Sequence, residues 1–66
     1  MDVQYADVEV PLTGTDGNAF AIIGSVARAL RLVHGEAAAS AYVAKASAAG
    51  SYDGLFALTM QTVQVQ

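Results

Sequence analysis

His34, Arg28 and Arg31 are the side chains of this sequence whose chemistry is easiest to name. His34 is the single histidine, and an imidazole acts as a general base only beside a group that carries a transferable proton. The chain has no cysteine, and a Ser/His/Asp arrangement can be drawn only by choosing residues freely. We therefore expect His34 to cap the end of a helix, where a basic side chain also favours the helix dipole.

Arg28 and Arg31 stand three residues apart, so they share one face of a helix. Guanidinium groups suit contacts with phosphate or with an acidic partner. The alternative is a solvated polar strip in which an arginine pairs with Glu36 or with an acid near the N-terminus, and surface pairs of that kind contribute about 0–1 kcal/mol. If the protein binds an acidic surface, these two arginines are the residues we expect to do so.

Tyr52 and Asp53 are the second candidate for a binding patch, with Tyr5 near the N-terminus as a further aromatic residue. Tyrosine is enriched in the residues that dominate binding energy at protein interfaces. The alternative is a core position in which the hydroxyl group finds a hydrogen-bond partner. The sequence leaves these two interpretations open.

The sequence offers no metal or cofactor motif. With one histidine and no cysteine, a structural zinc site would need ligands from another chain. The segment TGTDGNAF lacks the lysine and the spacing of a phosphate-binding loop, so it indicates a turn that leads into a helix. The carboxylates are few and scattered. We expect no catalytic residues, no cofactor and no metal, and hence a protein that is not an enzyme.

The composition favours association with another chain. The protein has 66 residues, of which 55% are hydrophobic and 14% are charged, against about 25% charged in a typical soluble domain. A domain this small buries a limited core and needs an additional source of stability. Without disulfides or a metal, we expect a homo-oligomer, with a dimer favoured, or a protein partner that covers one face.

Charge and hydropathy restrict the classes of partner that we expect. The net charge is −3 with three basic side chains, whereas nucleic-acid-binding proteins usually carry a basic surface. The apolar stretches are shorter than the roughly 20 residues that cross a bilayer. We therefore expect a soluble cytoplasmic protein that binds neither a membrane nor, in the leading hypothesis, a nucleic acid.

Alternation predicts strands at both ends of the chain. In residues 7–12 the apolar side chains alternate with acids, which indicates a half-buried strand. Because proline has no N–H to donate, either the strand ends at Pro11 or it lies at an edge of the sheet. Val3 and Tyr5 alternate in the opposite phase, so either a bulge shifts the register or residues 1–6 form a looser arm. Residues 62–66 alternate again and predict a closing strand.

Three helices are predicted between the strands, over residues 18–33, 36–49 and 51–61. Thr15, Asp16 and Asn18 are alternative N-caps of the first helix, and Gly35 ends it. Ser51 is the expected N-cap of the third. We expect a close approach of another backbone at Gly24, because glycine weakens a helix. The wide apolar face of the first helix comprises Phe20, Ile22, Ile23, Val26, Ala27, Ala29, Leu30 and Val33.

These elements predict one α+β domain over residues 1–66, in the order β-α-α-α-β. We expect the terminal strands to pair and the three helices to pack on one face; the sense of the pairing stays open. The third helix contributes Leu55, Phe56, Leu58 and Met60 to the expected core. Because a two-stranded sheet is marginal alone, edge pairing in a dimer would extend it to four strands.

The blocks TDGNAFAIIGSVARAL and GSYDGLFALTMQTVQV resemble a family of short phage and prophage proteins of unknown function. The resemblance covers about residues 8–66 and implies no catalytic residues. This chain departs from the family pattern at Ala27, where a second arginine is common, at Gly54, where histidine is common, and at Thr62, where an aromatic residue is common.

Two functional hypotheses follow from the sequence. The leading one is a non-enzymatic phage-type protein that acts by binding a host or phage protein, using Arg28, Arg31, Tyr52 and Asp53. The alternative is a nucleic-acid-associated regulator that uses the small arginine patch, and it predicts binding that weakens steeply with salt.

Overall fold

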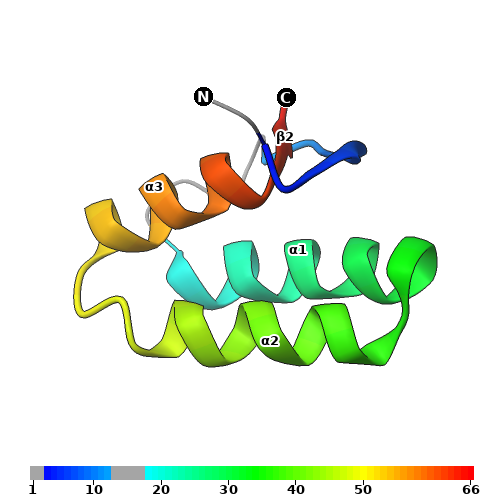
Figure 1. The fold of residues 1–66 in the computed structure, drawn as a ribbon. Coiled ribbons are helices and arrows are strands. Elements are labelled where there is room, and N and C mark those ends of the chain that lie inside the picture. Colours follow the sequence, from blue (N-terminus) through cyan, green and yellow to red (C-terminus); the bar gives the residue numbers. More distant parts are fainter. Residues whose placement is uncertain (1–2, 13–17) are drawn as a thin grey trace.

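The structure, a computed structural model, describes residues 3–12 and 18–66 (Figure 1). It confirms the α+β class, the element order and the pairing of the terminal strands. The turn at residues 13–17, with the cap candidates Thr15 and Asp16, lies outside the described residues. The elements in chain order are β1 (Tyr5–Val10), α1 (Ala19–His34), α2 (Glu36–Ser47), α3 (Tyr52–Thr62) and β2 (Val63–Val65).

The two strands run parallel, and their pairing register shifts between Tyr5 and Glu9. The strand therefore begins earlier than residue 7, and the irregular register accounts for the change of phase that the sequence shows there. Ahead of the strand, the Gln4 N–H donates to the Gln61 carbonyl at 2.9 Å. A looser arm is thus the wrong alternative for residues 4–6, while residues 1–2 lie outside the described part.

Pro11 lies immediately after β1, on an edge of the two-stranded sheet. The Val10 carbonyl accepts from the Gln66 N–H at 3.0 Å, and the Leu12 N–H donates to the Gln66 carbonyl at 3.4 Å. Because backbone groups alternate in direction along a strand, those of Glu9 and Pro11 face away from β2. The position where Pro11 lacks an N–H therefore faces away from β2. The sheet loses no hydrogen bond there, which explains how it tolerates Pro11.

α1 is the central helix of the domain. It packs against β1 on one side and along α2 on the other, and α2 packs mainly on α1 (Figure 1). Ile22, Val26 and Leu30 of α1 are almost completely buried. The other buried apolar residues of the core are Val8, Val10, Leu12, Ala27, Ala39, Tyr42, Ala46, Leu55 and Val63.

Capping residues mark the helix boundaries that the sequence predicts. The Asn18 side chain accepts a hydrogen bond from the Ala21 N–H at 3.1 Å, and the Ser51 hydroxyl accepts one from the Gly54 N–H at 3.0 Å. Gly35 has a φ of 95° and joins α1 to α2. Among the described residues, no helix combines the length and the apolar composition that crossing a bilayer requires.

Three core assignments made from the sequence are wrong. Phe20 is 87% exposed, Val33 is 54% exposed and Met60 is 52% exposed. Each lies on an apolar side of its helix that no neighbouring element covers. The close backbone approach expected at Gly24 is also missing, because a Cβ atom placed there would meet nothing within 4 Å.

Candidate protein interaction surface

The side of α1 that faces solvent carries a row of four residues spaced by four: Phe20, Gly24, Arg28 and Leu32. At this spacing successive side chains lie next to one another along the helix. All four residues are exposed, and the side chains at the two ends of the row, Phe20 and Leu32, are 87% and 80% exposed. We call this row the outer face of α1. A large apolar residue at each end of one row gives the domain a surface whose burial would be favourable.

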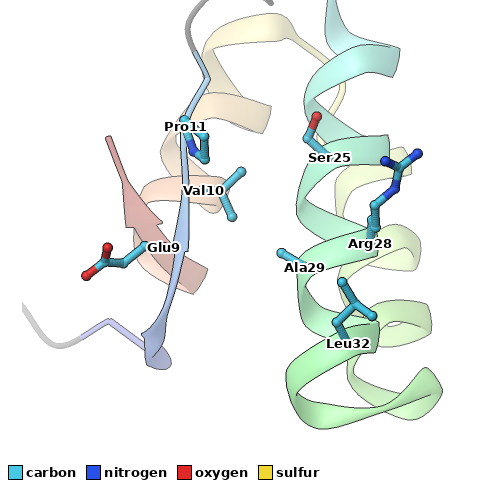
Figure 2. A pocket seen from close by; sticks show the side chains of 7 residues that line it. All are labelled: Glu9, Val10, Pro11, Ser25, Arg28, Ala29 and Leu32. Atoms are coloured by element: carbon cyan, nitrogen blue, oxygen red, sulfur yellow. The ribbon is translucent and has the colours of Figure 1, made fainter.

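A groove of about 300 Å³ runs between β1 and α1, beside the outer face (Figure 2). Figure 2 shows the Arg28 side chain rising from α1 next to Ser25, while the Glu9 side chain points away from α1. The Glu9 carboxylate accepts a hydrogen bond from the Gln66 side-chain amide. The groove therefore combines a cation with apolar walls that are formed by Val10, Pro11, Ala29 and Leu32.

A second groove, of about 370 Å³, lies at the Phe20 end of α1. Phe20 and Ile23 line it from α1, and Leu55 and Tyr52 line it from α3. The Tyr52 ring stacks on Phe56 with a centroid distance of 6.2 Å and an interplanar angle of 9°. Tyr52 keeps 38% of its surface exposed, so it presents part of an aromatic face to the groove region.

The two candidate arginines have different surroundings. The Arg31 Nε–H donates to Glu36 Oε1 at 2.8 Å, which confirms the pairing that the solvated-strip alternative predicts. The hydrogen bond from Arg31, joined by one from the Ser40 hydroxyl, lowers the pKa of Glu36. Arg28, in contrast, forms no ion pair within the described residues. Arg28 is thus the arginine of α1 that is available to a partner.

His34 lies in the last turn of α1, as expected, but its imidazole ties the helix to β1. Its Nε2 atom lies 3.0 Å from Asp7 Oδ1, and its ring packs on Tyr5 with a centroid distance of 4.6 Å. The hydrogen bond with His34 lowers the pKa of Asp7. The contact gives His34 a structural partner, and the sequence did not predict that partner.

The structure does not bring all the predicted binding residues into one site. Arg28 lines the groove beside β1, whereas Tyr52 lines the groove at the other end of α1. Asp53 is exposed in the first turn of α3, where its charge suits the helix dipole. Sequence reasoning missed Phe20 as a surface residue. The glycine and the arginine in the same row are a local signal of an exposed side, but the apolar residues around most of the helix mask it.

Within residues 3–12 and 18–66, no three His, Cys, Asp or Glu side chains gather where they could hold a metal ion. Comparisons of the chain with protein-family models, with curated proteins and with solved structures give no match. The resemblance to phage and prophage proteins therefore stays a prediction.

Proposed function

We propose that this protein is a small interaction module that binds another protein through the outer face of α1. The observation that carries the proposal is the exposure of Phe20 and Leu32 on either side of Arg28, which forms no ion pair in the described chain. Protein interfaces are enriched in aromatic side chains and arginine, and an exposed leucine adds apolar area beside them. The central helix of the domain presents that combination in one row.

Burial of this face supplies a realistic driving force. Transferring a phenylalanine or leucine side chain from water to an apolar contact contributes about 1.5–3 kcal/mol. A standard interface buries about 800 Å² on each partner, which is roughly a fifth of the 4066 Å² surface of this chain. The two grooves adjoin the outer face, because Phe20 lines one of them and Arg28 and Leu32 line the other.

We place the partner among phage or host proteins, following the sequence resemblance, and the protein itself in the cytoplasm, where the absence of cysteine is common. We assign no catalytic role. The alternative, a nucleic-acid-associated regulator, has less support, because Arg31 is paired with Glu36 and so leaves Arg28 alone on this face. A single phosphate contact gives a weak salt dependence of binding and little affinity.

A pull-down from host-cell lysate tests the proposal when it is made with matched variants. The bait proteins are the wild type, the double variant Phe20→Ala/Leu32→Ala, and Met60→Ala. Met60 is a suitable control because it is 52% exposed on α3 and lines neither groove. Each pull-down is repeated after nuclease treatment.

We expect a protein that survives nuclease treatment, that is recovered by the wild type and Met60→Ala, and that is lost with the double variant. Recovery that is independent of Phe20 and Leu32 would refute the assignment of the face. Recovery that disappears with nuclease would favour the nucleic-acid alternative.

A further inference from the structure

Gly24 occupies the middle of the outer face, four residues from Phe20 and four from Arg28. Within a helix, glycine is less favourable than every residue except proline. The described chain gives no steric reason for it, since a Cβ atom at this position would meet nothing within 4 Å. Glycine on an exposed helix surface does permit another backbone to approach closely. The reason for Gly24 is therefore to be sought outside the single chain.

We propose that a second copy of this chain docks on the outer face, with the two α1 helices antiparallel and crossing at Gly24. This inference rests on the proposed function because it uses the same face, so a second copy and a phage or host protein would compete for it. In a symmetric dimer each copy uses the same surface, so the residues on one side of the axis must complement those on the other. Phe20, Gly24 and Arg28 of the outer face meet that requirement, and Leu32 lies beyond this contact, eight residues from the axis.

The equal spacing of Phe20, Gly24 and Arg28 makes this part of the row complementary to itself. With the two-fold axis at Gly24, residues at equal distances on opposite sides of it face each other. Phe20 then lies against the partner's Arg28, and Arg28 lies against the partner's Phe20. A guanidinium group over an aromatic ring is attractive, so one dimer contains this contact twice.

The same geometry keeps like charges apart. Arg28 and the partner's Arg28 are eight residue steps apart along the pair, which is about 12 Å at 1.5 Å per residue. This separation exceeds the screening length of about 8 Å at physiological salt. Rows of residues spaced by four also interdigitate in the commonest class of helix packing, at a crossing angle of about −50°.

The outer edge of β1 is a less suitable surface for a second copy. At the C-terminal end of β1 the outward backbone groups belong to Glu9 and Pro11, and Pro11 has no N–H to donate. A sheet that continues through this edge would lose a ladder hydrogen bond at Pro11 in each copy. We therefore assign self-association to α1 and not to edge pairing through β1.

Covalent trapping tests the crossing point. Because the chain has no cysteine, Gly24→Cys carries a single thiol, and a disulfide forms when two Cα atoms come within about 4.4–6.8 Å. The control is Ala44→Cys, at an exposed position of α2. At equal protein concentration we expect Gly24→Cys to form the linked dimer at least about tenfold faster, because docking raises the effective concentration of the second thiol. Equal rates would overturn the proposal.

Sedimentation equilibrium tests the contact without a covalent bond. Gly24→Leu inserts a good helix former, so the chain stays folded while close approach is blocked. The control is Ala44→Leu. We expect the wild type and Ala44→Leu to self-associate and Gly24→Leu to stay monomeric. Phe20→Ala and Arg28→Ala should each weaken association by about tenfold, and the double variant should weaken it by less than the product of the two effects.

Self-association of Gly24→Leu at the wild-type strength would overturn the proposal. The outcomes also separate this inference from the proposed function. A monomeric wild type that still captures a protein through Phe20 overturns the dimer and leaves the interaction module in place. A monomeric wild type that captures nothing through Phe20 overturns both.

Discussion

Replacing Thr59 by valine would leave the Tyr42 hydroxyl without a hydrogen-bond partner inside the domain. Thr59 Oγ1 donates to the Leu55 carbonyl at 2.9 Å and lies 2.8 Å from the Tyr42 hydroxyl oxygen. A threonine hydroxyl has one proton, so Tyr42 must be the donor in the second bond. Tyr42 is 3% exposed and Thr59 is fully buried. The same burial raises the pKa of Tyr42.

The two single substitutions, Thr59→Val and Tyr42→Phe, should lower the free energy of unfolding by different amounts. Thr59→Val leaves a buried hydroxyl unpaired, which costs about 1–3 kcal/mol. Tyr42→Phe removes that hydroxyl and leaves Thr59 bonded to Leu55, so the loss is one hydrogen bond, or about 0.5–1.5 kcal/mol. The double variant should cost less than the sum, because no unpaired donor remains. In a domain of this size the total free energy of unfolding is roughly 3–10 kcal/mol, so the difference is measurable.

Urea unfolding followed by far-ultraviolet circular dichroism measures these free energies, and each 1 kcal/mol also shifts the Tm by about 4–8 °C. The control is Thr62→Val. Thr62 is also buried and donates to a carbonyl of its own helix, that of Leu58, at 2.7 Å, but no second hydroxyl depends on it. The reasoning is refuted if Thr59→Val costs no more than Thr62→Val, or if the costs at Thr59 and Tyr42 simply add.

Three further predictions concern single sites. In His34→Ala, an NMR titration should show the pKa of Asp7 rising toward its ordinary value of 3.8, because the hydrogen bond with His34 lowers it. In the wild type this bond contributes stability that is fully present above about pH 4 and is lost as the pH falls through the lowered pKa; acid unfolding of His34→Ala should lack this contribution. Gly35→Ala should cost about 1–3 kcal/mol in urea unfolding, because its φ of 95° and ψ of 176° suit glycine almost exclusively. Gly24→Ala should stabilise the dilute, monomeric chain by about 0.5–1 kcal/mol in the same assay, since its position is helical and open. Effects of the same sign at Gly24 and Gly35 would contradict the difference drawn between them.

Features that depend on a few neighbouring residues could be predicted from the sequence. The N-caps Asn18 and Ser51 were identifiable because their side chains bond to amides three residues ahead. The alternation in residues 7–12 predicted the inward side chains of β1, and Gly35 predicted the end of α1. In each case the deciding interaction lies within one turn of helix or a short stretch of strand, so no knowledge of the rest of the fold is needed.

Features that depend on residues far apart in the chain could not be predicted from the sequence. The parallel sense of the strands follows from how three helices carry the chain back across the sheet, and no local pattern encodes it. The contact between His34 and Asp7 joins residues 27 positions apart, after α1 has packed on β1. The partner of Arg31 was predictable as one of two alternatives, because Glu36 lies just beyond the helix end.

The outer face of α1 shows where periodicity ceases to be informative. Apolar residues occupy most of the circumference of this helix, so the pattern alone does not show which side lacks a neighbour. The reversal at Gly35 lays α2 along one side, and β1 covers another. Phe20 and Leu32 then lie on the side that neither covers. With Gly24 and Arg28 between them, they form a row that makes sense as a contact surface only once these neighbours are placed.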